Sequence, residues 1–168
     1  MNPFRAVICA CLLSVACAAP ATARIACANP EQVKAAQLRQ LHYELQVAAL
    51  NCRNDIPLMP TQWLNYVQRH GATLADNARV LRDYFKSTAA FDKHNTVITN
   101  RQSVLVHETP GYCEIHTSIF DKVATLTPPQ LVAFAVETEG DPMEIHACPQ
   151  HKAEATHKPK KAAKKKAE

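Results

Sequence analysis

The side chains with the clearest chemical potential lie near the end of the chain. Met143, His146, Cys148 and His151 follow one another at intervals of three, two and three residues. Imidazole, thioether and thiolate groups are good ligands for copper and zinc. The spacing therefore supports a histidine-based Cu or Zn site on Met143, His146 and His151, whose affinity depends on Cys148 being a free thiolate. Without that site, we expect no cofactor.

Other catalytic chemistry has weaker signals. The three serines that follow residue 23 do not lie in a Gly-x-Ser-x-Gly elbow, so a serine nucleophile is not indicated. Glycoside chemistry needs two carboxyl groups about 5 to 10 Å apart, and the sequence alone cannot bring two together. The carboxyl groups considered are Glu108, Glu114, Glu137, Glu139, Asp141 and Glu144. An enzyme is thus an alternative only if its site assembles in the fold.

The histidines are concentrated in the second half of the chain. Five of the eight follow residue 100, at positions 107, 116, 146, 151 and 157. His70 and His94 lie on apolar faces of predicted helices, where a hydrogen-bonded core histidine is the usual case. We therefore interpret His70 and His94 as core residues.

The N-terminal segment has the pattern of an export signal. Arg5 precedes an apolar run over residues 6–19, and the small residues Ala21, Thr22 and Ala23 follow it. This pattern predicts a secretory signal peptide over residues 1–23. The apolar run is shorter than the roughly 20 residues that cross a bilayer. We expect an exported protein, periplasmic or extracellular, without a membrane span.

Composition favours helices. Only 3 of the 168 residues are glycine, too few for a phosphate-binding loop, and 6% are aromatic. Apolar residues recur at helical spacing from Leu38 to Cys52, after Asn29 as N-cap and Pro30 in the first turn. Gly71 is expected to end a short second helix, and Thr73 to start a third. Three further helices are expected after Ser87, from Cys113, and after Thr127.

These segments predict an all-α bundle of five to six helices over residues 24–148. Four cysteines follow the signal, an even number that is typical of disulfides in exported proteins. Cys27 and Cys52 flank the first helix, roughly 35 Å apart at 1.5 Å per residue, so they cannot pair. Either Cys27–Cys148 with Cys52–Cys113, or Cys27–Cys113 with Cys52–Cys148, remains. We favour the first because it ties the ends of the domain together.

Four segments share a recognisable pattern: residues 41–52 (LHYELQVAALNC), Tyr66-Val67, residues 77–85 (NARVLRDYF) and Tyr112-Cys113. Together they resemble a group of small exported helical proteins of unknown function from proteobacteria. The resemblance spans about residues 38–133 and concerns helix seams and cysteine positions. It implies a Cys52–Cys113 bridge and carries over no chemistry.

The excess of positive over negative charge comes from the C-terminus. Residues 24–148 hold 11 Lys and Arg against 13 Asp and Glu, whereas residues 149–168 hold 7 Lys against 2 Glu. Such a segment has no apolar face, so we expect a disordered basic tail. The predicted polyanion-binding residues are Lys158, Lys160, Lys161, Lys164, Lys165 and Lys166. The favoured hypothesis is a non-catalytic envelope protein whose tail contacts an anionic polymer or a protein partner; nucleic acid is not its expected physiological ligand.

Overall fold

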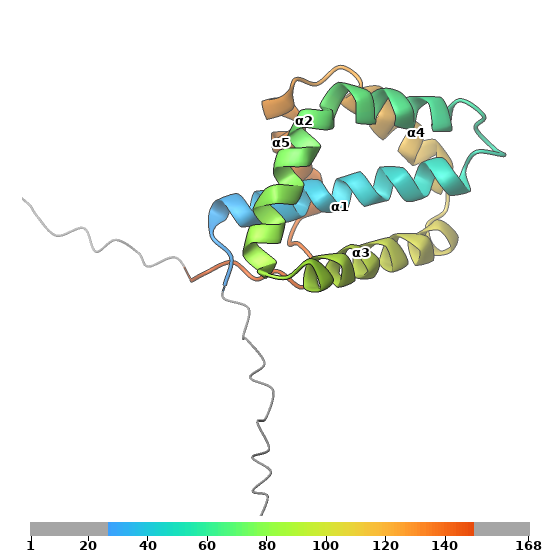
Figure 1. Ribbon diagram of the computed structural model, residues 1–168. Coiled ribbons are helices and arrows are strands. Elements are labelled where there is room, and N and C mark those ends of the chain that lie inside the picture. Colours follow the sequence, from blue (N-terminus) through green and yellow to red (C-terminus); the bar gives the residue numbers. More distant parts are fainter. Residues whose placement is uncertain (1–26, 150–168) are drawn as a thin grey trace, which may run out of the picture.

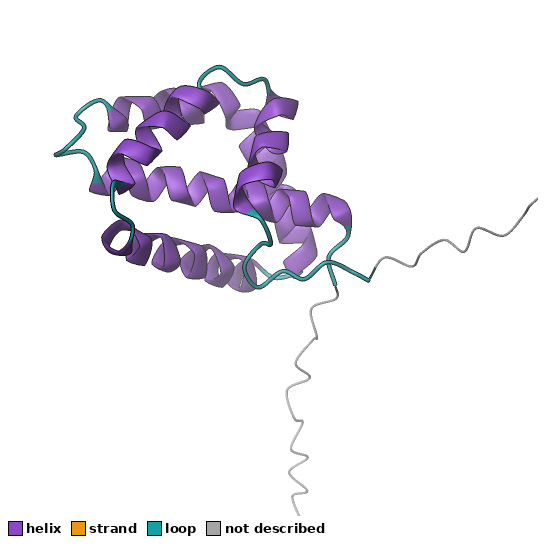
Figure 2. Cartoon of the chain, turned by 180° about the vertical axis from the view of Figure 1, so that it is seen from behind, coloured by secondary structure: helices purple, strands orange, loops and turns teal. Residues whose placement is uncertain are grey.

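The computed structural model describes residues 27–149. The predicted signal peptide, His151 and the lysines of the predicted tail lie outside these residues. Within them the chain forms five helices: α1 (Pro30–Asn51), α2 (Met59–Phe85), α3 (Thr88–Glu108), α4 (Tyr112–Val123) and α5 (Pro128–Glu139). Residues 27–149 are drawn as helices and loops without a strand (Figure 2). Their only β pairing is one isolated bridge of Ala28 with Ala147. The prediction of an all-α fold is confirmed.

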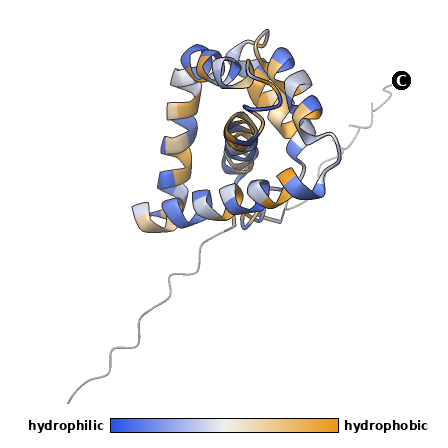
Figure 3. Cartoon of the chain, turned by 90° about the vertical axis from the view of Figure 1, so that its right-hand side faces the viewer, coloured by the Kyte–Doolittle hydropathy of each residue, from blue (hydrophilic) through white to orange (hydrophobic). Residues whose placement is uncertain are grey.

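Helix α1 lies in the middle of the domain, and the other four helices surround it (Figures 1 and 3). Each of them contacts α1 directly. Every residue from Ala35 to Leu41 is buried, which covers nearly two turns of helix and therefore all of its faces. The sequence analysis predicted an apolar stripe on one side of this helix. The structure instead buries the helix all round, so several of its polar side chains also lie in the core.

The start of α1 follows from its first residues. The Asn29 side chain accepts a hydrogen bond from the Gln32 backbone, and the Gln32 side chain accepts one from the Asn29 backbone, each at 2.9 Å. This capping box pairs two backbone N–H groups that the helix leaves free, and Pro30 lacks the donor that would otherwise be unpaired there. Thr127 and Gln130 form the corresponding box before α5. Both predicted helix starts are confirmed.

The prediction that a helix ends at Gly71 is wrong. Helix α2 continues through this residue, and its buried positions keep their spacing on both sides, with Tyr66 and His70 before the glycine and Leu74 and Ala78 after it. Burial of that continuous face outweighs the cost of about 1 kcal/mol for a glycine inside a helix. The local signal for a helix end is therefore overridden by packing against α1.

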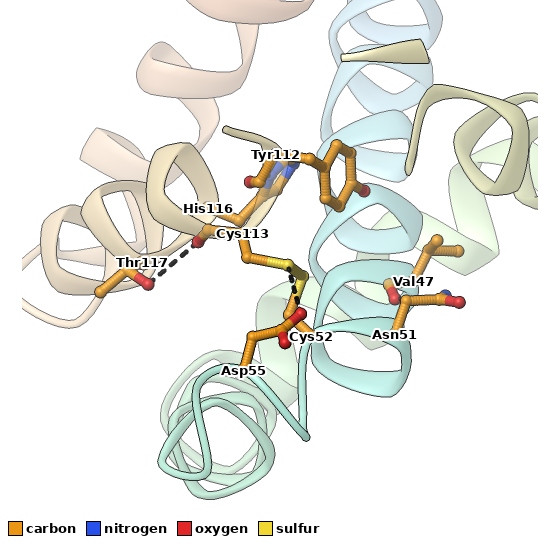
Figure 4. The surroundings of a disulfide bond; sticks show 8 residues. All are labelled: Val47, Asn51, Cys52, Asp55, Tyr112, Cys113, His116 and Thr117. Atoms are coloured by element: carbon orange, nitrogen blue, oxygen red, sulfur yellow. Dashed lines mark hydrogen bonds between the residues drawn. A yellow bond between two sulfur atoms is a disulfide. The ribbon is translucent and has the colours of Figure 1, made fainter. Parts of the chain in front are cut away.

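Two disulfides close the domain. Cys27 and Cys148 have Cα atoms 4.7 Å apart, and Cys52 and Cys113 have theirs 5.5 Å apart. The second bridge joins the end of α1 to the start of α4 (Figure 4). Beside the first, Cys148 N–H donates to the Ala28 carbonyl at 2.8 Å, and Ala28 N–H donates to that of His146 at 2.8 Å. The favoured pairing is confirmed, and the chain segments before α1 and after α5 are held side by side.

None of the helices in residues 27–149 has the combined length and apolar character that a bilayer crossing requires.

We expect that replacing both Cys52 and Cys113 with Ala lowers the free energy of unfolding by about 4 kcal/mol, because the lost bridge no longer restricts the unfolded chain. The two residues are separated by 61 positions. Urea denaturation of the variant and of the oxidised parent measures the difference. Peptide mapping without reduction provides the control on connectivity, and a Cys52–Cys148 peptide would contradict the assignment.

Replacing Gly71 with Ala should raise the free energy of unfolding by about 0.5 to 1 kcal/mol, because alanine loses less backbone entropy in a helix. Apart from the neighbouring residues and backbone of the helix itself, no heavy atom lies within 4 Å of the position that the new Cβ would occupy. Ala72→Gly, at the exposed neighbouring position of α2, is the matched control and should lower it by a similar amount. A destabilised Gly71→Ala protein would show that the helix is interrupted there after all.

Candidate functional site

The polar side chains of α1 point outward from the central helix to different neighbours. Gln37, Arg39 and Gln40 are all buried, and the Glu44 side chain is 17% exposed. Arg39 Nε donates to Asn95 Oδ1 of α3 at 3.0 Å, and its guanidinium lies over the Phe91 ring. A buried polar group without a partner costs free energy, so these contacts restrict how the other helices can pack on α1.

Glu44 is paired with a buried histidine. Glu44 Oε1 lies 2.8 Å from His116 Nε2, and His116 Nδ1 lies 2.6 Å from the Tyr112 carbonyl oxygen. A carbonyl can only accept, so Nδ1 carries a proton, and the Nε2 contact shares a further proton between the imidazole and the carboxyl group. The Tyr112 ring stacks on the imidazole with centroids 3.8 Å apart (Figure 4). The pair is thereby held in one orientation.

Glu139, near the end of α5, is the second carboxyl group of the site. Gln40 Nε2 donates to Glu139 Oε2 at 3.2 Å. Burial raises the pKa of Glu139 to about 8, and the neighbouring charge of Glu44 and a hydrogen bond with it act in the same direction. Glu139 therefore holds its proton near neutral pH, and Glu44 accepts a hydrogen bond from it. Two carboxyl groups that share a proton in this way can donate one, accept one or bind a cation.

A pocket of about 410 Å³ opens beside this carboxyl pair. It lies where α1, α3, α4, α5 and the segment after α5 meet. Its polar lining comes from Gln40, Glu44, Arg101, Gln102, Thr138 and Glu139, and its apolar lining from Leu41, Leu105, Ile119 and Met143. Arg101 is exposed at the rim, where its Nη1 lies 3.4 Å from Glu108 Oε2. The pocket thus combines acidic groups in its wall with an apolar surface.

Hydrogen bonds from α1 fix the segment that follows α5. Gln37 Nε2 donates to the Gly140 carbonyl at 2.6 Å, and Met143 N–H donates to Gln40 Oε1 at 2.7 Å. Gln40 thus bonds both Glu139 and the backbone of Met143. Because one side chain holds both, the carboxyl group and the adjoining wall of the pocket are positioned together.

The structure separates the residues of the predicted metal site. Met143 lines the pocket beside Glu139, whereas His146 is exposed and lines a different pocket. Cys148 is disulfide-bonded and has no thiolate to offer. In the part of the chain from residue 27 to 149, no three His, Cys, Asp or Glu side chains are placed to hold a metal ion together. His151 lies outside these residues, so the Cu or Zn site stays a prediction.

Three further histidines are enclosed by the fold. His70 Nε2 lies 3.1 Å from the Val123 carbonyl oxygen, as expected for a core histidine. His94 is 2% exposed; its Nδ1 lies 3.5 Å from Glu144 Oε2, but neither ring nitrogen makes a hydrogen bond within residues 27–149. His42 lies among aromatic rings, and burial lowers its pKa to about 4. The interpretation of His70 and His94 as core residues is correct, but the expected hydrogen bond is found only for His70.

Sequence reasoning named two members of the carboxyl and histidine cluster without placing them together. Glu139 was one of six acidic residues considered, and His116 one of the late histidines. Glu44, Gln40 and Gln102 were missed, since each stands among helix residues that read as solvent-facing. The all-round burial of α1 reveals Gln40 and Glu44, and the packing of α3 against α1 reveals Gln102.

Comparisons of the chain with protein-family models, curated proteins and solved structures find no match. The resemblance to small exported helical proteins therefore stays a prediction.

Replacing Glu139 with Gln should change how stability depends on pH. The pKa of Glu139 is raised from 4.5 to about 8 on folding, so its contribution to stability is complete below pH 4.5 and is lost as the pH rises to about 8. Glutamine does not titrate. The variant should therefore gain stability relative to the parent across that range, by at most about 1.4 kcal/mol per pH unit.

Urea denaturation at several pH values measures this difference. Glu137→Gln, at an exposed position of the same helix, is the matched control and should follow the parent at every pH. Parallel curves for Glu139→Gln and the parent would mean that Glu139 ionises normally in the folded protein.

Proposed function

We propose that this protein is a non-catalytic exported binding module. Its disulfide-bonded helical domain holds a cationic C-terminal segment, and that segment binds anionic polymers of the cell envelope. The observation that carries the proposal is the position of the Cys27–Cys148 bridge. It joins the residues just before α1 to the residue next to the lysine-rich segment 149–168. The start of that segment is therefore cross-linked to the residue that precedes the first turn of α1.

Charge supports the same function. Residues 24–148 carry 11 basic and 13 acidic side chains, so the domain itself has no excess positive charge to attract a polyanion. Residues 149–168 carry 7 lysines and 2 glutamates. Attraction between such a segment and a polyanion is electrostatic, and it weakens with salt as counterions are released and the Debye length shrinks. Lysine side chains act as point charges and do not require a shaped partner.

The disulfides also support an extracytoplasmic site of action. Both bridges persist only where the surroundings are oxidising, and such surroundings are typical of exported proteins. An anionic envelope polymer, such as lipopolysaccharide, is a partner class whose charge suits an exported cationic segment. The proposal leaves the pocket beside Glu44 and Glu139 without a role.

We expect a chain truncated after Pro149 to fold normally, because both bridges and all five helices of residues 27–149 are retained. It should lose most of the parent's retention on immobilised lipopolysaccharide or heparin at low salt. Variants of the parent with fewer lysines in residues 149–168 should elute at progressively lower salt concentrations. Retention is measured by elution in a salt gradient, with circular dichroism as the check on folding.

A charge-matched pair of triple variants makes the test specific. The first variant replaces three lysines of the C-terminal segment with Gln and should weaken retention: Lys164, Lys165 and Lys166. The second replaces three exposed lysines of the domain with Gln and should have little effect: Lys34, Lys93 and Lys122. Equal effects of the two variants, full retention of the truncated chain, or binding that ignores salt would each refute the proposal.

A further inference from the structure

The segment that follows α5, residues 140–148, forms a strap across the domain. It runs from the end of α5 past the first turns of α3 to the start of α1, and none of it is helical (Figure 1). Hydrogen bonds from Gln37 and Gln40 of α1 hold its first half, and the Cys27–Cys148 bridge fixes its far end. Between these attachments Ile145 is buried in an apolar cluster with residues of α1, α2 and α3. The strap therefore completes part of the core.

His94, in the second turn of α3, lies against this strap. Its Nδ1 lies 3.5 Å from Glu144 Oε2, and its ring packs on Phe85 of α2 with centroids 4.9 Å apart. His94 is almost fully buried, yet neither ring nitrogen makes a hydrogen bond within residues 27–149. A neutral imidazole carries one N–H donor and one acceptor nitrogen, and buried groups of this kind are nearly always paired. The contact between α3 and the strap thus contains an unpaired group that can take up a proton.

Glu144 has a backbone conformation that is unusual for its residue type. Its φ is +57°, in the left-handed region that residues other than glycine adopt only at a cost in free energy. Its side chain is 47% exposed, so the carboxylate keeps much of its hydration beside the enclosed imidazole. The strap residue that meets His94 is therefore held in place by the attachments on either side of it, and release would relieve its backbone.

We propose that residues 140–148 are an acid-released strap, which detaches from α3 when His94 takes up a proton. The Cys27–Cys148 bridge keeps the far end attached, so the release is local. It brings His94 and Ile145 into contact with water, and it uncovers an apolar surface near the start of the lysine-rich segment. This device is independent of the polyanion-binding function.

The surroundings of His94 oppose a positive charge on its ring. Burial lowers the pKa of His94, and the neighbouring charge of Glu144 raises it by too little to compensate, while Arg39 of α1 lowers it further. From α2, the Phe85 ring packs on the imidazole, and the Arg82 guanidinium lies over the Phe91 ring, one turn of α3 before His94. The closed strap therefore favours the neutral imidazole.

The direction of the pH effect follows from this preference. When the strap opens, water reaches the ring, and the pKa of His94 returns toward its ordinary value of 6.5. Below that pH the open form binds more protons than the closed form, so the equilibrium constant for opening rises as the pH falls. The rise is at most about tenfold for each pH unit, and it ends where the closed form is protonated as well.

The test measures backbone hydrogen exchange of the full, disulfide-bonded chain at about pH 7.5 and about pH 5. The Met143 N–H, which bonds Gln40, reports on the strap, and the Cys52 N–H at the end of α1 is the internal reference. After correction for intrinsic exchange rates, acidification should raise the opening constant at Met143 on the order of tenfold more in the parent than in His94→Phe. Cys52 should show no such difference.

The variant His94→Phe keeps an aromatic ring against Phe85 and removes both unpaired nitrogens, so it should fold and lack this acid response. Its comparison with the parent at each pH cancels the titration of Glu139, which acts in the opposite direction because its buried form is neutral. His107→Phe, at an exposed position of the same helix, is the matched control and should follow the parent.

A second variant tests the direction of the effect. Glu144→Gln removes the carboxylate that partly supports a protonated ring in the closed form, so it should show a larger acid response than the parent. The chain truncated after Pro149 should respond as the parent does, which separates this device from polyanion binding.

An equal acid response in the parent and His94→Phe, or the same rise at Cys52 as at Met143, would overturn the proposal. If circular dichroism shows that His94→Phe does not fold, Glu144→Gln decides alone: a response no larger than that of the parent would then overturn it.

Discussion

The rest of the structure depends on the burial of α1 on all its faces. A helix inside a bundle is normally apolar all round, but α1 carries Gln37, Arg39, Gln40 and Glu44 among its enclosed residues. Each of these groups must find a partner, because desolvation without a hydrogen bond costs more than a single helix contact returns. Their partners come from α3, α4, α5 and the segment after α5. The polar contacts of one helix therefore dictate where the others lie.

The candidate site lies where the buried polar groups of α1 are least well matched by their partners. Arg39 and Gln37 have neutral partners, but Glu44 and Glu139 are two acids in one recess, and they coexist by sharing a proton. A purely structural core would avoid such a pair, since apolar side chains of similar size fill the space at lower cost. The same low polarity that raises the pKa of Glu139 also strengthens any charge interaction made in the pocket.

The two disulfides act on different parts of this arrangement. Cys52–Cys113 joins the end of α1 to α4 one turn before His116, and so holds the partner of Glu44 against the central helix. Cys27–Cys148 closes the opposite end and fixes the chain where the lysine-rich segment begins. The pocket beside Glu44 and Glu139 and the start of the lysine-rich segment thus belong to one disulfide-linked domain.

The sequence by itself determined the helical class, the starts of α1 and α5, and the favoured pairing of the cysteines, because capping, apolar spacing and helix length are local properties. It also located the positive charge. The continuation of α2 through Gly71 was decided by tertiary structure, since the packing of its whole buried face outweighs a local end signal. Tertiary structure also decided that Glu44, Gln102, His116 and Glu139 lie close together. These residues come from four helices. Whether a polar residue on a helix faces solvent or the core depends on how many other helices surround that helix. No local pattern in the sequence specifies that number.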